Sequence, residues 1–156
     1  MTVRGLTLAD FDAVNALFMQ IQNLHIEYRP DLYRKLDKPT TPKAWDYEAS
    51  LKDDNKIMLG AEVDGIIVGF CIAEIRRTES RALVPHVVAH IDDIVVDANY
   101  RRQGFGKALY LEAVKTGKAR GADTVELNVY SFNESAVAFY KSLGMTEKSY
   151  TMEQKI

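Results

Sequence analysis

Residues 101–106 read Arg101-Arg102-Gln103-Gly104-Phe105-Gly106, a glycine-rich turn between two segments of different pattern. Before it, residues 91–96 have the β-branched density of a buried strand, and after it, apolar residues recur at helical spacing over 108–114. Two glycines at a strand-to-helix junction let backbone N–H groups turn toward an anion, and the helix N-terminus adds partial positive charge. The turn therefore predicts a cradle for a phosphate or pyrophosphate group.

Three kinds of turn share this pattern. A nucleotide P-loop ends in Gly-Lys-Ser/Thr, whereas Gly106-Lys107 is followed here by Ala108, so the magnesium-binding hydroxyl is missing. A dinucleotide site has glycine or alanine where Leu109 stands and opens a β-α-β unit, although Glu126 lies at the distance of its ribose-binding acid. The third alternative, two glycines that only shape a turn, stays open on this motif alone.

The rest of the chain alternates helical and strand patterns. Apolar residues at three- and four-residue steps predict a helix over 11–28 that Pro30 stops, and a second helix is expected from Thr41-Pro42 toward Leu51. Asp64-Gly65 separates two β-rich runs as a two-residue hairpin turn would. The other expected elements are strands over 3–6, 57–63, 66–75, 86–96 and 124–130, helices from the glycine turn to about residue 121 and over 134–143, and a closing strand after Gly144. The order β-α-α-β-β-β-α-β-α-β predicts an α/β (α+β) fold with a mixed, mostly antiparallel central sheet flanked by helices.

Composition narrows the class of protein. With 156 residues and 47% hydrophobic content, we expect one domain over 1–156. A net charge of -2 lacks the basic surface of a nucleic-acid binder. The sequence shows neither a signal peptide nor an apolar run of roughly 20 residues, so we expect no membrane partner and a cytoplasmic protein. Cys71 is the single cysteine, which excludes an intramolecular disulfide, and its apolar neighbours indicate a core strand.

A second motif, Asn133-x-x-Ala136-x-x-Phe139-Tyr140-x-x-x-Gly144, follows the strand expected at 124–130. Together with Arg101-x-x-Gly104-x-Gly106, it resembles the motif pair of the GNAT superfamily, the Gcn5-related N-acetyltransferases. The specific part of the resemblance covers residues 90–145, and the element order extends it over most of the chain.

The resemblance implies the GNAT fold, an acetyltransferase activity and an acetyl-CoA site at a splay between the parallel strands at 91–96 and 124–130. The pyrophosphate would lie on the amides of 103–108, the pantetheine arm would pair with the backbone of 94–96, and the side chain of Asn133 would contact that arm. No metal is expected. The residues implied to bind acetyl-CoA are Ile94, Val95, Val96, Arg101, Arg102, Gln103, Gly104, Phe105, Gly106, Lys107, Ala108, Asn133 and Tyr140.

Catalysis by direct attack of an amine needs an acid and a base. Tyr140 matches the family tyrosine that donates a hydrogen bond or proton to the departing thiolate. Asp92 is the expected base, through water, with His90 on the same strand face and the neighbouring Asp93 as alternatives. The two acids would point to opposite faces if the strand is regular. By family position, the backbone N–H of Ile94 is the expected oxyanion donor.

The acceptor is the least readable part of the function. The expected partner is a small-molecule amine, with a peptide amine as the alternative and a non-catalytic CoA-binding module as a third reading. The family resemblance also allows a homodimer. The early part of the chain is aromatic and charged in a way that could hold an amine, although its rings could instead pack on the sheet. These residues are His25, Glu27, Tyr28, Arg29, Asp31, Tyr33 and Trp45.

Overall fold

The computed structural model describes residues 1–35 and 46–156 of the chain. The expected start of the second helix at Thr41-Pro42, and Trp45, lie outside the described residues. Eleven elements follow one another in the described part. They are β1 (Thr2–Gly5), a 3-10 turn (Leu8–Asp10), α1 (Phe11–Tyr28), α2 (Tyr47–Lys52), β2 (Lys56–Val63), β3 (Ile66–Thr78), β4 (His86–Val96), a second 3-10 turn (Ala98–Tyr100), α3 (Phe105–Ala119), β5 (Thr124–Leu127) and α4 (Glu134–Ser142).

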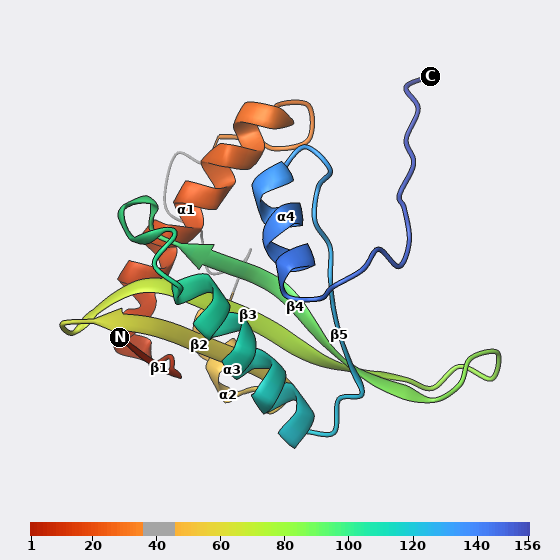
Figure 1. Cartoon of the computed structure of the whole chain (residues 1–156), viewed down its shortest axis with the longest axis horizontal. Helices are drawn as coiled ribbons and strands as arrows, with labels where there is room; N and C mark the ends of the chain where they lie inside the picture. Colours follow the sequence, from red (N-terminus) through yellow and green to blue (C-terminus); the bar gives the residue numbers. More distant parts are fainter. Residues whose placement is uncertain (36–45) are drawn as a thin grey trace.

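The five strands form one sheet in the order β1-β2-β3-β4-β5, so the spatial order follows the chain (Figure 1). All neighbours are antiparallel except β4 and β5, which are parallel. The hairpin turn between β2 and β3 has positive φ at both Asp64 and Gly65, 50° and 79°, as a two-residue turn of the expected kind requires. The predicted mixed, mostly antiparallel sheet is confirmed.

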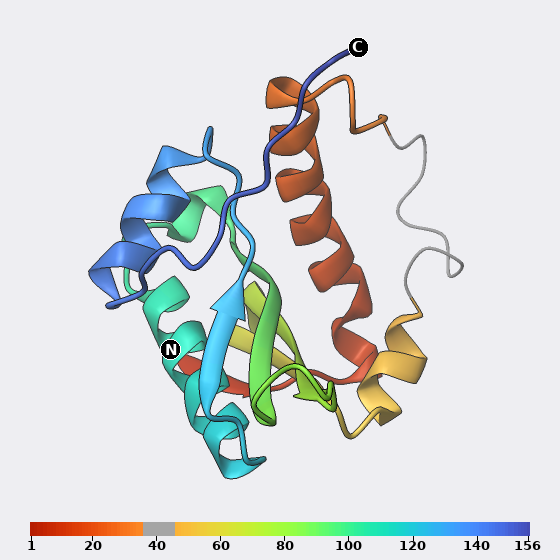
Figure 2. The same cartoon turned by 90° about the vertical axis from the view of Figure 1, so that its right-hand side faces the viewer.

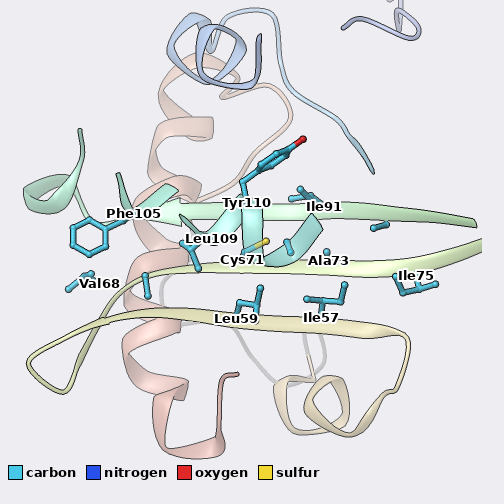
Figure 3. Close-up of a cluster of buried hydrophobic side chains, with 13 residues drawn as sticks. Ile57, Leu59, Val68, Cys71, Ala73, Ile75, Ile91, Phe105, Leu109 and Tyr110 are labelled. Carbon is cyan, nitrogen blue, oxygen red and sulfur yellow. The ribbon is translucent and has the colours of Figure 1, made fainter. Parts of the chain in front are cut away.

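Helices cover both faces of the sheet. Figure 2 shows α3 and α4 on one side and α1 and α2 on the other. Each face has its own buried core. The α3-side core holds Ile57, Leu59, Ala61, Val68, Cys71, Ala73, Ile75, Ala89, Ile91, Phe105, Leu109, Tyr110 and Ala113 (Figure 3). The α1-side core holds Leu6, Val14, Leu17, Tyr47, Met58, Ile67, Phe70, Ile72 and Val95.

Leu109 anchors α3, and with it the glycine turn, to the sheet. Its side chain is fully buried in the α3-side core. Leu109→Ala is expected to lower the free energy of unfolding by about 2–5 kcal/mol, because the change removes buried methyl groups and leaves a cavity. Urea unfolding followed by circular dichroism measures this, and a loss below about 1 kcal/mol would show that α3 does not depend on the contact.

The prediction of a closing strand after Gly144 is wrong. Residues 145–156 form no strand, and Figure 1 shows them as an extended stretch that leaves the sheet. Tyr150 and Met152 are 80% and 88% exposed, so the segment buries too little apolar surface to offset the entropy of ordering a strand. Ion pairs attach it instead, from Glu153 to Arg29 and from Lys148 to Glu126.

The strand expected over 124–130 is also shorter than predicted, since β5 ends at Leu127. No helix in residues 1–35 or 46–156 combines the length and the apolar character needed to cross a membrane.

Candidate active site

The sheet opens between β4 and β5. Pairing between the two strands runs from Val88 opposite Thr124 to Ile91 opposite Leu127 and stops there. β4 continues to Val96, whereas the chain after Leu127 turns away as a loop toward α4. Beyond Ile91, therefore, no strand of the described residues lies beside β4 on the β5 side. This backbone edge includes the expected cofactor residues Ile94, Val95 and Val96.

A β-bulge lies where this opening begins. Across β3, Ile72 is opposite Asp93 and Ala73 is opposite Ile91, so Asp92 is an extra residue in β4. Ile91 packs in the α3-side core, whereas Val95, four residues later, packs in the α1-side core. In a regular strand these two side chains would share a face.

The bulge changes the expected placement of the two acids. The expectation of opposite faces assumed a regular strand, and the bulge corrects it. Asp93 lies opposite Ile72, which packs in the α1-side core. Asp92 forms ion pairs with Lys56 and Arg76. Both of these cations also pair with Glu74, which lies two residues after Ile72 in β3 and therefore on the same face. Both acids are therefore on the α1 side of the sheet.

Asp92 belongs to an ion-pair network on that face. Its carboxylate lies 3.1 Å from Arg76 and 3.4 Å from Lys56, and both cations also contact Glu74, at 3.1 and 3.5 Å. His90 Nε2 is 4.0 Å from Asp92 Oδ1, so these two candidate bases are neighbours, as expected. Burial lowers the pKa of His90, and the charge of Arg76 lowers it further against the opposing charges of nearby carboxylates, so the neutral imidazole is favoured.

Asp93 has a different environment. Burial, reinforced by the negative charge of Asp92, raises the pKa of the Asp93 carboxyl to about 6. The charge of Asp93 in turn helps to raise the pKa of Tyr140, after the larger effect of burial and that of Cys71. It also adds to the raised pKa of Tyr33, which burial and a hydrogen bond with Tyr130 bring to about 12. Asp93 therefore lies within electrostatic reach of both tyrosines.

The glycine turn forms an open helix start. Gly104 is the N-cap of α3 with a φ of 89°, no side chain caps the helix, and its first turn contains no acid. Arg102, two residues before Gly104, also has a positive φ, of 64°. The first N–H groups of α3 therefore have no side-chain acceptor, which is the geometry that the predicted anion cradle needs.

Side chains around the turn have separate roles. Arg101 donates from Nε to the carbonyl of Val96 at 3.2 Å, and Gln103 donates to the carbonyl of Asn99 at 3.2 Å, so both shape the loop. The N–H of Ala108 already bonds to the carbonyl of Gly104 at 3.0 Å. Arg102 and Lys107 are exposed, whereas Phe105 is buried, so only its backbone can face a ligand. Gly106 lies against Phe139, where an added Cβ would be 3.4 Å from the ring.

Asn133 starts α4 beside this site. Its Oδ1 accepts hydrogen bonds from the Ala136 backbone N–H at 3.2 Å and from the Ser135 hydroxyl at 3.1 Å. The side-chain amide N–H groups donate to no residue of the described chain, so they remain for a ligand. A helix cap and a ligand contact are compatible at this position.

Five rings contact one another where α1 meets the loop between β5 and α4, and they form what we call the aromatic cluster. His25 and Tyr28 come from α1, and Tyr33 follows it, as the sequence had suggested for an amine site. Tyr130 and Phe132, on the loop before Asn133, were missed. A signal existed, because two aromatic residues flank Ser131 immediately before the second motif. In residues 1–35 and 46–156, no group of three His, Cys, Asp or Glu side chains could hold a metal ion.

Comparison with known proteins finds relatives that are named as N-acetyltransferases. The chain is 33% identical over 154 residues to an uncharacterised N-acetyltransferase of Methanocaldococcus jannaschii, covering 94% of this chain and 61% of that protein. It is 32% identical over 120 residues to an N-alpha-acetyltransferase of Sulfurisphaera tokodaii, covering 72% of each. The structure of a mutant of the BH1408 protein from Bacillus halodurans superposes with a TM-score of 0.94, 28% identity and coverage of 100% and 99%.

The model of the Acetyltransferase (GNAT) family matches residues 18–145. This range contains β2 to β5, the open helix start of α3 and the whole of α4. Because the match includes both sequence motifs and the strands that separate around them, the chain belongs to the GNAT family of acetyltransferases.

Proposed function

We propose that the chain is an N-acetyltransferase that transfers the acetyl group of acetyl-CoA to a primary amine by direct attack. The observation that carries the proposal is the opening between β4 and β5, together with the uncapped start of α3. Asp93 and Tyr140, which lie within electrostatic reach of each other, support it.

The residues present fit acetyl-CoA. A pyrophosphate needs N–H donors and positive potential, which the start of α3 and the exposed Arg102 and Lys107 supply. A pantetheine arm carries two amides, which match the unpaired backbone edge of β4 and the free amide N–H groups of Asn133. Of the expected pyrophosphate donors, Ala108 contributes least because its N–H is already bonded within the helix.

When bound, acetyl-CoA supplies a thioester carbon that an unprotonated amine attacks, so that a C–N bond replaces the C–S bond and CoA leaves as a thiol. An alkylammonium has a pKa near 10.4, so a base must take its proton at neutral pH. Asp93 is the base we assign, because a carboxyl with a pKa of about 6 is ionised at pH 7 yet basic enough to accept a proton. Asp92, the residue favoured by sequence, has its carboxylate shared between Lys56 and Arg76.

Tyr140 assists the departing sulfur. Burial raises the pKa of its hydroxyl, so the group stays protonated throughout the neutral range. A free thiol has a pKa of about 8.5, so full proton transfer from this phenol is uphill and its contribution is a hydrogen bond to the developing thiolate. The backbone N–H of Ile94 remains the proposed oxyanion donor from its position in the family pattern.

Two acceptor classes follow. A small-molecule amine is our first assignment. The Sulfurisphaera tokodaii relative is named as an N-alpha-acetyltransferase, which favours a peptide N-terminus as the second. A non-catalytic CoA-binding module has the least support, because a buried acid, Asp93, and a buried phenol, Tyr140, lie within electrostatic reach of each other.

Thiol release from acetyl-CoA, measured over a panel of alkylamines, amino acids and short peptides, tests this function. The expected result is amine-dependent thiol release accompanied by the acetylated acceptor in the mass spectrum. Binding of acetyl-CoA without turnover of any acceptor would contradict the proposal and favour the binding module.

Tyr140→Phe is expected to lower kcat about 10- to 100-fold, because a hydrogen bond to a charged leaving group is worth about 1.5–3 kcal/mol. The Michaelis constant for acetyl-CoA should change less than about twofold, since the ring still fills the same volume. Steady-state kinetics of both proteins measure the two constants. An unchanged kcat would remove Tyr140 from the mechanism.

A further inference from the structure

Gln20 of α1 reaches the loop that leads from β4 to the glycine turn. Its side-chain amide donates from Nε2 to the Asp97 carboxylate at 2.8 Å and accepts at Oε1 from the Ala98 backbone N–H at 3.3 Å. A carboxylate only accepts and a backbone N–H only donates, so a single orientation of the amide satisfies both groups. One side chain thus binds two consecutive loop residues that lie 77 and 78 positions away in the chain.

Asp97 connects this contact to the hydrogen bonds within the loop. Its second carboxylate oxygen, Oδ1, accepts from the Asn99 backbone N–H at 2.8 Å and caps the 3-10 turn Ala98–Tyr100. The carbonyl of Asn99 accepts in turn from the side chain of Gln103 at 3.2 Å, and Gln103 directly precedes Gly104. A series of hydrogen bonds therefore leads from α1 to the residue before the N-cap of α3.

The loop is held from both faces of the sheet. On the α3 side, the ring of Tyr100 packs against the α3-side core and meets the ring of Phe105 edge-on, with centroids 5.9 Å apart. On the α1 side, the loop is bound by Gln20. Because apolar packing is non-directional whereas a hydrogen bond weakens steeply with its angle, the Gln20 contact constrains the orientation of the loop.

The same face of α1 also contacts the start of α4. Leu24 and Tyr28 follow Gln20 at four-residue steps, so the three side chains lie along one face of the helix. Leu24 and Tyr28 line a cavity of about 380 Å³ whose other lining residues include Phe132 and Asn133, and the rings of Tyr28 and Phe132 stack with centroids 4.7 Å apart. One face of α1 thus contacts both regions to which the proposed function assigns CoA.

We propose that Gln20 is a positioning residue for acetyl-CoA, which holds the β4–α3 loop so that the first N–H groups of α3 face the pyrophosphate. The inference rests on the proposed function and adds to it a residue that lies outside both sequence motifs. Gln20 acts through Asp97 rather than on the reacting atoms. Its removal should therefore weaken pyrophosphate binding and leave the chemical step unchanged.

Gln20→Ala is expected to weaken acetyl-CoA binding about tenfold, because it removes two hydrogen bonds, one of them to a charged group. KM for acetyl-CoA should rise by the same factor with kcat unchanged. S-acetylpantetheine has the thioester and the arm but no pyrophosphate, so its kcat/KM should be the same in both proteins. Isothermal titration and steady-state kinetics measure these quantities.

Gln22→Ala is the matched control on the same helix. Gln22 lies two residues further along α1 and donates to the carbonyl of Arg34 at 3.4 Å, so the variant loses a hydrogen bond of α1 that does not involve the β4–α3 loop. It should keep the wild-type affinity for acetyl-CoA within about twofold. Urea unfolding of both variants shows whether they lose similar stability.

An exchange of partners distinguishes positioning from a general loss of stability. Gln20→Glu alone sets two carboxylates against each other, and Asp97→Asn alone sets two amide NH₂ groups against each other, so each should lose about tenfold in affinity. In the double variant, the amide at position 97 donates to the carboxylate at position 20, which still accepts from the Ala98 N–H. Affinity for acetyl-CoA should then return to within about twofold of the wild type.

The outcomes separate this proposal from acetyl transfer. Unchanged affinity in Gln20→Ala, a double variant no better than the single ones, or an equal loss with S-acetylpantetheine overturns the positioning role and leaves acetyl transfer standing. Weakened and rescued CoA binding in a protein that acetylates no acceptor supports the positioning role and overturns acetyl transfer. A wild-type protein that does not bind acetyl-CoA overturns both.

Discussion

Asp93→Asn is expected to lower kcat/KM by about 10²–10⁴-fold, because an amide cannot accept the proton that the acceptor ammonium must lose before its amine attacks. In the wild type, kcat/KM should rise with pH around the Asp93 pKa of about 6, and this rise should be absent from the residual activity of the variant. Rates measured from pH 5 to 9 with one amine acceptor give both quantities. A variant that keeps the rise near pH 6 would assign the base elsewhere.

The same substitution should stabilise the fold above pH 6. The folded-state pKa of Asp93 is raised from 3.8 to about 6, so the charged form is disfavoured by folding. Below about pH 4 the Asp93 carboxyl therefore does not lower the free energy of unfolding. Its destabilising effect grows as the pH rises from about 4 to about 6 and is constant above that. We expect the free energy of unfolding of Asp93→Asn to be about 3 kcal/mol higher than that of the wild type at pH 8 and nearly equal to it at pH 3. Urea unfolding at the two pH values measures the difference.

Asp92→Asn is the matched control, one residue away on the same face. The substitution removes the ion pairs that Asp92 forms with Lys56 and Arg76. Such solvent-accessible pairs contribute little to the free energy of unfolding. Its expected loss of kcat/KM is below about tenfold. If Asp92→Asn loses more activity than Asp93→Asn, the sequence-based choice of Asp92 is right and our assignment of Asp93 is wrong.

Gly104→Asp is expected to weaken acetyl-CoA binding about 100-fold. The residue is the N-cap of α3, so a carboxylate there would compete for the helix N–H groups and repel a pyrophosphate. Gly104→Asn introduces a side chain of the same shape without charge and should lose about tenfold. Isothermal titration with acetyl-CoA gives both affinities.

Gly121→Asn provides the control for backbone strain. Gly121 lies after the other end of α3 with a φ of 87°, against 89° at Gly104, and an added Cβ meets nothing within 4 Å at either position. Both asparagine variants should therefore lose similar stability, while only Gly104→Asn loses affinity. Equal affinity in the two variants would show that the glycine turn does not hold the ligand.

Local pattern and composition predicted most of the fold. The helix over 11–28 has the predicted bounds because its apolar spacing and the following Pro30 act within the helix itself. The strand over 86–96 and the turn at Asp64-Gly65 are likewise decided by neighbouring residues. The start of α3 at the glycine turn follows from the same local chemistry.

Features that depend on distant partners were not readable. The bulge at Asp92 arises from pairing with β3, and it changes which acid is buried. The prediction of a closing strand was wrong because the sequence of residues 145–156 does not reveal how little of its apolar surface is buried against the rest of the protein. The aromatic cluster required α1 and the loop before α4 to meet, which no periodicity within either segment indicates.

The stoichiometry of the reaction tests the central claim most directly. Purified protein is incubated with acetyl-CoA and a peptide or alkylamine acceptor, and the thiol released and the amide formed are measured in the same sample. Direct transfer predicts one thiol for each amide, with neither formed when the amine is left out. Thiol release without amide, or no release with any acceptor, would contradict acetyl transfer at the opening between β4 and β5.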